Sequence, residues 1–164
     1  LKNLNSNQNK KFFKKSLNII PYQFLILIIF IQIIIGAFVS GLDAGKIYQT
    51  WPLMGDSLLP NDLIQESYKT ILDFNNHSLV QFYHRNLAYM IIIYFSCLVI
   101  FIYKNKLINL YKSLKILSLF LFLQVSLGIF TLISGLNIYL ASLHQITSVL
   151  LILSAINLYY LKTK

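Results

Sequence analysis

The stretch PYQFLILIIFIQIIIGAFVSG, residues 21–41, contains no charged side chain and is mainly aliphatic. A helix rises about 1.5 Å per residue, so roughly 20 such residues cross the hydrocarbon core of a bilayer. Three further stretches share this character, at residues 79–103, 114–134 and 138–161, and 57% of the 164 residues are hydrophobic. This composition exceeds what a soluble core of this size can bury. The sequence therefore predicts an all-α integral membrane four-helix bundle.

Charge sets the expected orientation of the four spans. Eleven lysines fall on one side of a four-span topology, whereas the loop at residues 42–78 carries every Asp and Glu. The eleven are Lys2, Lys10, Lys11, Lys14, Lys15, Lys104, Lys106, Lys112, Lys115, Lys162 and Lys164. By the positive-inside rule the lysine side is cytoplasmic. Both termini are predicted to be cytoplasmic, with residues 1–20 as a Lys-rich linker, residues 21–164 as the bundle and residues 42–78 as an outer loop. Because the basic residues flank spans, no nucleic-acid surface is expected.

The ends of the chain and its cysteine content carry less information. The first apolar run is too long for a secretory signal, and three more spans follow it. The chain begins with Leu1 rather than Met, so we expect an internal piece of a longer protein. Cys97 is the only cysteine, which excludes an intrachain disulfide.

Two histidines are the strongest candidates for a functional site. His84 and His144 each lie about five residues inside the same end of two different predicted spans, at residues 79–103 and 138–161. An ionisable side chain at membrane depth is costly and marks function by default. The pair therefore predicts two imidazole ligands for one metal centre. The competing interpretation is that each histidine only bridges helices.

An internal repeat supports a common centre for the two histidines. FIQIIIG at residues 30–36 resembles FLQVSLG at residues 122–128, so Gln32 and Gly36 match Gln124 and Gly128. The predicted fold is thus two repeated helix hairpins, which symmetry brings to equivalent places. For the Gln and Gly residues themselves, the preferred interpretation is helix packing.

The type of ligand favours heme over a bare metal ion. Zinc wants four ligands, and no Cys or carboxylate lies at the depth of the histidines, whereas heme needs only two axial groups. His77 falls outside the span and is expected to be solvated. Small residues near the histidines leave room for a flat group: Ala88, Ala141, Ser148 and Ala155. Arg85 either pairs with a heme propionate or is an interfacial arginine that extends toward water, and both interpretations stay open.

Several motifs together resemble a known family. They are GAFVSGLDAG at residues 36–45, TWPLMGD at 50–56, QFYHR at 81–85, QVSLG at 124–128 and LHQ at 143–145. In this order they are similar to the C-terminal half of heme A synthase, the cytochrome oxidase assembly enzyme. The resemblance extends from about residue 36 to the end of the chain.

The resemblance implies an activity and a cofactor. Heme A synthases are similar to two fused four-helix bundles and oxidise a methyl group of heme O to the formyl group of heme A. It implies that the C-terminal bundle holds heme b between two histidines, which by motif are His84 and His144 here, with Arg85 as a further cofactor-binding residue. The heme O substrate is implied to lie in the N-terminal bundle, which this chain lacks, so the catalytic residues stay unknown.

Two axial histidines leave no open position on the iron, so we expect this half to transfer electrons. The expected partners are membrane lipid, heme O through the N-terminal half, and heme O synthase or oxidase assembly proteins. The expected location is a bacterial inner (plasma) membrane, with the mitochondrial inner membrane ranked second.

Alternatives to the synthase stay open. The chain could be a bis-histidine b-type cytochrome or a quinol-linked redox subunit without heme-modifying activity, or a structural assembly factor. The outer loop contains a predicted amphipathic helix from Asp62 to Asp73. The loop, with Trp51-Pro52 and this helix, either lies along the outer surface and covers the propionate edge of the heme, or is a connector anchored at the interface by Ile64, Tyr68 and Ile71.

Overall fold

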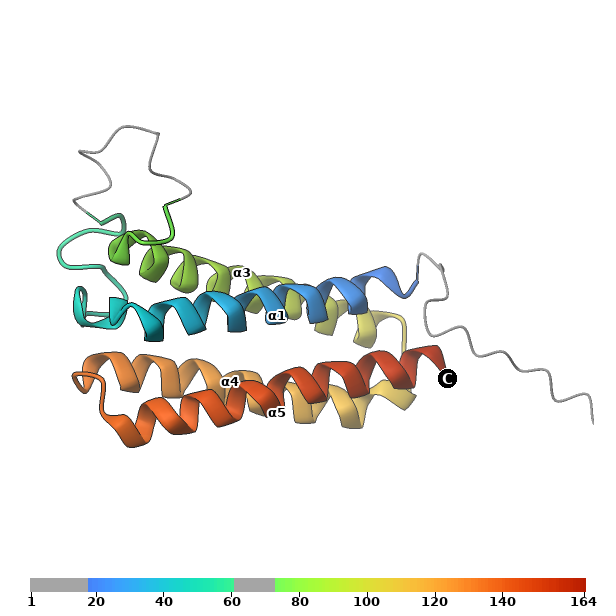
Figure 1. The fold of residues 1–164 in the computed structure, drawn as a ribbon. Coiled ribbons are helices and arrows are strands. Elements are labelled where there is room, and N and C mark those ends of the chain that lie inside the picture. The colour runs from blue at the N-terminus through green and yellow to red at the C-terminus, as the bar shows by residue number, and fades with distance from the viewer. Residues whose placement is uncertain (1–17, 61–72) are drawn as a thin grey trace, which may run out of the picture.

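The computed structural model describes residues 18–60 and 73–164. Their long helices are α1 (Ile20–Gly41), α3 (His77–Lys104), α4 (Tyr111–Ile133) and α5 (Ile138–Thr163), with two short 3-10 helices, η1 (Ala44–Lys46) and η3 (Ile108–Leu110). Each long helix is long and apolar enough to cross a membrane (Figure 1). Within the described ranges there is no strand. The all-α class with four potential spans is confirmed.

The helix ends differ from the predicted spans by up to three residues, because polar residues still form helix beyond the apolar stretch. α3 begins at His77, two residues before the predicted span, since the Asn76 side chain accepts a hydrogen bond from the Leu79 amide at 3.0 Å. Asn137 caps α5 in the same way, through the amides of Tyr139 and Leu140. α4 begins at Tyr111 rather than residue 114, so Lys112 lies within the helix.

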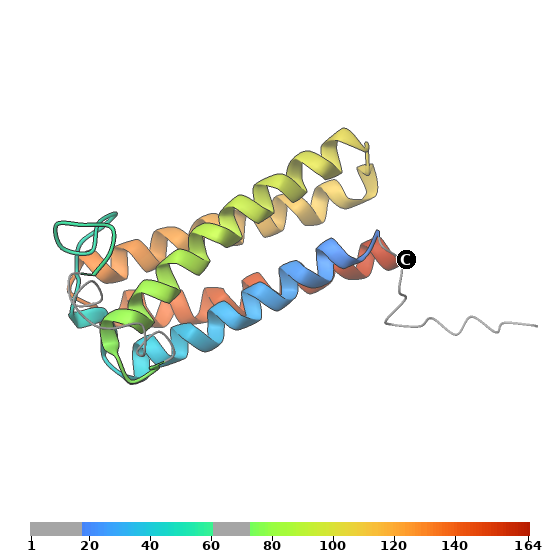
Figure 2. The same ribbon diagram turned by 90° about the horizontal axis from the view of Figure 1, so that it is seen from above.

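The helices form two hairpins. α1 packs along α3, and α4 packs along α5; the hairpins then meet mainly through α1 and α5 and less through α3 and α4 (Figures 1 and 2). The start of α1 and the end of α5 lie at the same end of the bundle (Figure 1). This arrangement confirms the predicted hairpin pair. The side of the membrane on which each end lies remains a prediction.

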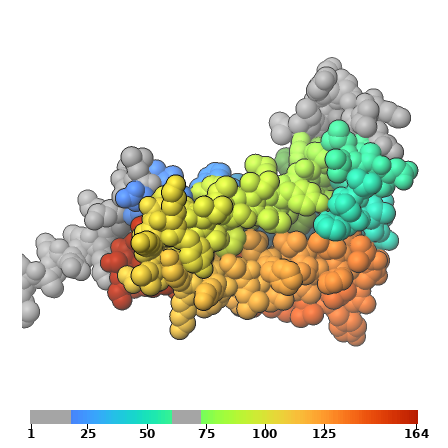
Figure 3. Space-filling view, turned by 180° about the vertical axis from the view of Figure 1, so that it is seen from behind, coloured from blue at the N-terminus to red at the C-terminus, as the bar shows by residue number. Residues whose placement is uncertain are grey.

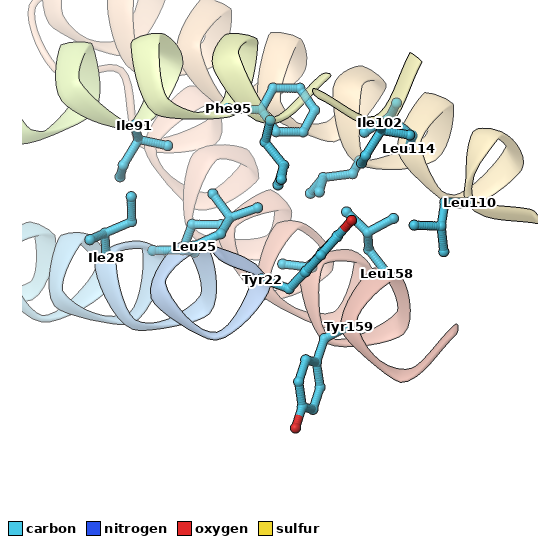
Figure 4. Close-up of a cluster of buried hydrophobic side chains, with 14 of the residues drawn as sticks. Tyr22, Leu25, Ile28, Ile91, Phe95, Ile102, Leu110, Leu114, Leu158 and Tyr159 are labelled. Carbon is cyan, nitrogen blue, oxygen red and sulfur yellow. The ribbon is translucent and has the colours of Figure 1, made fainter. Parts of the chain in front are cut away.

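The packed core is concentrated at the end where α1 begins and α5 ends. Tyr22, Leu25, Ile102, Leu114 and Leu158 are almost fully buried there and come from all four long helices (Figure 4). Polar contacts join the helices at the same end. The Tyr94 hydroxyl donates to Pro21 O at 2.8 Å, and the Asn157 amide donates to Ser113 Oγ at 3.1 Å. This end of the bundle is closed by side-chain packing.

The segment from residue 42 to residue 60 covers the other end of the bundle. Figure 3 shows it against the ends of α3 and of the α4–α5 hairpin. Gly45 lies against Leu136 in the α4–α5 turn, where an added Cβ would meet Leu136 Cδ2 at 2.9 Å. η1 is therefore in close contact with the second hairpin. The amphipathic helix predicted from Asp62 to Asp73 and nearly all of the predicted linker at residues 1–20 lie outside the described residues.

The core predicts a position-dependent loss of stability. We expect Leu158→Ala to lower the free energy of unfolding in detergent by about 2–5 kcal/mol, because it leaves a cavity in the packed end. Leu153→Ala is the matched control on α5, since Leu153 is 55% exposed and Leu158 only 1% exposed. Thermal unfolding followed by circular dichroism measures both. An equal loss for the two variants would contradict this description of the core.

Candidate functional site

Both predicted histidine ligands line one cavity. The cavity has a volume of about 690 Å³ and lies between the two hairpins, toward the end covered by residues 42–60. His84 reaches it from α3 and His144 from α5, and both side chains are half-buried. Most of the lining is apolar, with residues from α1, η1, α3, α4 and α5. The repeat in the sequence thus places two imidazoles in a common space.

His144 is held in a form suited to metal binding. Its Nδ1 lies 3.0 Å from the backbone oxygen of Gln124, which can only accept a hydrogen bond, so Nδ1 carries the proton. The lone pair of this neutral imidazole is then on Nε2. Metal-binding histidines commonly have such a carbonyl partner, which fixes the ring and the tautomer.

The side chain of Gln124 also contacts His144, and Thr147 holds it in place. Gln124 Nε2 lies 3.4 Å from His144 Nε2, while the Thr147 hydroxyl donates to Gln124 Oε1 at 2.5 Å. Thr147 is on α5, one turn from the histidine. The glutamine is therefore fixed at both its backbone and its side-chain amide.

His84 contacts Gln32, the glutamine at the matching position of the repeat, but through the side-chain amide alone. The Gln32 amide donates to the backbone oxygen of His84 at 2.9 Å. The same amide nitrogen is 3.2 Å from His84 Nδ1 and 3.4 Å from Nε2. Because the two ring distances are nearly equal, the amide lies against the ring rather than in line with one nitrogen. Gln32 therefore restrains the ring without selecting a tautomer.

The glycines of the repeat lie directly against the histidine rings. A Cβ added to Gly36 would be 3.0 Å from His84 Cε1, and one added to Gly128 would be 2.9 Å from His144 Cε1. Contacts this short are too close for an alanine without movement of the ring. The helix-packing interpretation of the Gln and Gly residues was incomplete, because what packs on them is the imidazole. The repeat in the sequence already contained this signal.

Arg85 connects α3 to the segment after η1. Its Nη2 donates to Tyr48 O at 2.8 Å and its Nη1 to Leu53 O at 3.1 Å. Gln81, one turn earlier, donates to the same Tyr48 oxygen at 2.9 Å. The sequence predicted neither contact, because they join positions more than thirty residues apart. Arg85 lines the cavity and also holds the chain that covers it.

The remaining predicted positions divide between the cavity and other regions. Ala88, Ala141 and Ser148 line the cavity as expected, but Ala155 belongs to the packed core and is 2% exposed. The prediction for Ala155 was wrong because α5 runs past the cavity into the closed end. His77 is exposed at the start of α3 and does not line the cavity.

Sequence reasoning missed some residues of the cavity, among them Gln81 and Lys46. Trp51 lines the cavity, as the interpretation of the outer loop as a cover over the heme edge expected. Gln81 is 2% exposed, which is unusual for a glutamine. In the sequence, an amide side chain within an apolar span could have indicated its role. Lys46 is the last residue of η1, and a sequence pattern does not reveal the path of the chain between α1 and α3.

The cavity fits a heme by its volume, its apolar lining and its donor atoms. Its volume is in the range of ligand pockets, its lining is mainly apolar, and it presents two imidazoles. Gln32 Oε1 and Gln81 Oε1 are buried without a hydrogen-bond partner among residues 18–60 and 73–164. The same ranges contain no group of three or more His, Cys, Asp or Glu that could hold a metal ion.

Comparison with known proteins identifies the family of this chain. Residues 3–156 match the family described as cytochrome oxidase assembly protein. The chain belongs to this family. Its membership confirms the resemblance drawn from the motifs, and the four apolar helices make it a multi-pass membrane protein. No solved structure gives a significant match.

Curated relatives of this family member are bacterial proteins named heme A synthase. That of Pelagibacter ubique (strain HTCC1062) is 44% identical over 144 residues, which cover 86% of this chain and 42% of that protein. That of Wolbachia sp. subsp. Brugia malayi (strain TRS) is 40% identical over 129 residues, which cover 77% of this chain and 36% of that protein. That of Rickettsia prowazekii (strain Madrid E) is 35% identical over 151 residues, which cover 87% of this chain and 45% of that protein. The chain spans about two fifths of the length of these relatives.

The Arg85 contacts predict how the covering segment responds to mutation. We expect Arg85→Gln to speed amide hydrogen exchange at Met54 and Gly55 about tenfold, because a hydrogen bond from a charged donor contributes about 1.5–3 kcal/mol. Arg85→Lys keeps the charge but cannot bridge both carbonyls, so it should have a similar effect. Asn86→Ala is the control, since that exposed side chain donates to Phe82 O within its own helix. Unchanged exchange in both Arg85 variants would refute the contact.

Proposed function

We propose that this chain is the C-terminal, heme b-binding half of a heme A synthase, the enzyme that oxidises a methyl group of heme O to the formyl group of heme A. The observation that carries the proposal is the single cavity to which equivalent positions of two hairpins contribute His84 and His144. Membership of the cytochrome oxidase assembly family and the share of its relatives' length support it.

In this proposal His84 and His144 are the axial ligands of the heme iron. Bound heme b supplies reversible one-electron transfer. Because two imidazoles fill both axial positions, this half has no coordination site for oxygen or substrate, and its role is electron transfer. The apolar lining of the cavity keeps water away from the porphyrin faces. Heme O is then bound outside this chain, in the N-terminal bundle that the resemblance implies.

Arg85 is proposed as a further cofactor-binding residue. It lines the cavity, and a guanidinium has five N–H donors, so it can contact a propionate while it holds Tyr48 O and Leu53 O. Lys46 and Asp43 also line the cavity, but Lys46 Nζ lies 2.8 Å from Asp43 Oδ2, so this pair adds no net charge and Arg85 supplies the positive charge. Positive charge at this mouth matches the negative charge of heme propionates.

The cellular setting is also part of the proposal. The curated relatives are bacterial, which favours the bacterial inner membrane. The lysine-rich end of the bundle is placed in the cytoplasm by the positive-inside rule. Heme O synthase and oxidase assembly proteins are the proposed partners.

A bis-histidine b-type cytochrome, including a quinol-linked redox subunit, is the second candidate function. The cavity with two imidazoles supports it equally, because such a protein also needs two axial ligands and an apolar pocket. The family and the names of the relatives favour the synthase.

The ligand assignment predicts the effect of histidine substitutions. In the full-length gene product, we expect His84→Ala or His144→Ala to abolish the low-spin spectrum of reduced heme b, because either change removes an axial ligand. His77→Ala is the control, since this exposed histidine lies outside the cavity. Absorption spectroscopy of purified protein measures all three. An unchanged spectrum in either ligand variant would refute the heme site.

The reaction needs a separate test. We expect the full-length gene to restore heme A in a bacterial strain that lacks its own heme A synthase, with heme A identified by chromatography and mass spectrometry of extracted hemes. A b-type cytochrome without heme-modifying activity would add only heme b. The vector without the gene and the His84→Ala variant are the controls.

A further inference from the structure

In each hairpin, the histidine ring lies against a glutamine and a glycine of the preceding helix. The first helix of the hairpin supplies a glutamine and, one turn later, a glycine, and both lie against the imidazole from the second helix. In the first hairpin these residues are Gln32, Gly36 and His84; in the second they are Gln124, Gly128 and His144. The arrangement occurs twice, on helices from separate parts of the chain, so one accidental contact does not explain it.

The glycines make space that no other residue would leave. A Cβ added to Gly36 would lie 3.0 Å from His84 Cε1, and one added to Gly128 would lie 2.9 Å from His144 Cε1, so the rings take up the space that a methyl group would need. Gly also costs about 1 kcal/mol relative to Ala in a helix interior, so helix formation alone would favour alanine at both positions. The close approach of the imidazole is the structural reason for glycine here.

The glutamines restrain the rings to different degrees. Gln124 accepts from His144 Nδ1 through its backbone, and its side chain is fixed by the Thr147 hydroxyl. Gln32 donates to the backbone of His84 and touches the ring with the same amide nitrogen, while its Oε1 has no partner among the described residues. The His144 ring is thus held by more directed contacts than the His84 ring.

We infer that Gln32 with Gly36, and Gln124 with Gly128 and Thr147, are positioning residues that set the orientation of the two axial imidazoles, and that His144 is the more firmly held ligand. This inference rests on the proposed heme site and adds residues that do not themselves touch the iron. Partners of metal-binding histidines typically change metal affinity by 10–100-fold when they are removed.

The glycine substitutions test the inference with a spectroscopic measurement. We expect Gly36→Ala and Gly128→Ala, made in the full-length gene product, to displace one imidazole each. Reduced heme b should then become partly high-spin and bind carbon monoxide, which the six-coordinate wild type does not bind. Gly41→Ala is the matched control on α1, because no heavy atom lies within 4 Å of its added Cβ. The assay reads ligation and is independent of catalysis.

A second set of variants removes atoms instead of adding them, so overpacking cannot explain its effects. We expect Gln32→Ala to weaken binding of hemin to the heme-depleted protein about 10–100-fold, as measured by titration. Gln124→Ala keeps the backbone oxygen that accepts from His144 Nδ1 and removes only the side-chain contact, so it should weaken binding by a smaller factor. Thr147→Val should weaken hemin binding less than Gln124→Ala. Thr147→Ser should bind hemin as the wild type does, because the hydroxyl is kept. Gln124→Ala and Thr147→Val, which act on the His144 ring, should also show less carbon monoxide binding than Gln32→Ala, which acts on the His84 ring.

The outcomes separate this inference from the proposed function. If wild-type protein shows a low-spin bis-histidine heme b while all glycine and glutamine variants match it, the positioning role is overturned and the heme site stands. If wild-type protein shows no such heme, the proposed function fails and this inference fails with it. Loss of ligation in both glycine variants, with the Gly41→Ala spectrum unchanged, supports the positioning role.

Discussion

The rest of the site depends on one constraint, namely that an imidazole within a membrane-spanning bundle must have polar partners. A polar group in an apolar medium costs several kcal/mol when it has none. His144 meets this requirement through Gln124 O, and His84 through contact with the Gln32 amide. In each hairpin the helix that precedes the histidine supplies its partner. Helix pairing and ligand positioning are therefore the same set of contacts.

The bundle divides its length between packing and binding. At one end, residues such as Leu25, Leu114 and Leu158 fill the space between the helices. Toward the other end, small residues including Gly36, Gly128 and Ala88 leave a cavity of about 690 Å³. A closed end stabilises the four helices, so the open end can hold a large group without its own packed core. Ala155 belongs to the closed end because α5 passes through both regions.

The cover over the open end is held by charge and by backbone carbonyls. Arg85 and Gln81 from α3 both contact Tyr48 O, and Arg85 also contacts Leu53 O. These contacts place Trp51 on the cavity and fix the chain that follows η1. An arginine in this position contacts the covering segment and also lines the cavity, and the first of these roles was not predicted from the sequence.

The sequence by itself determined the four apolar helices, the two hairpins and the histidine pair. Length, hydropathy and the repeat of Gln and Gly are local properties, and a membrane leaves few other ways to satisfy the backbone. Only the tertiary structure decided that Gly36 and Gly128 lie against the rings, that Thr147 fixes Gln124, and that Arg85 holds Tyr48 and Leu53. Those contacts depend on how helices rotate and approach one another, and that geometry is set by packing between residues far apart in the chain.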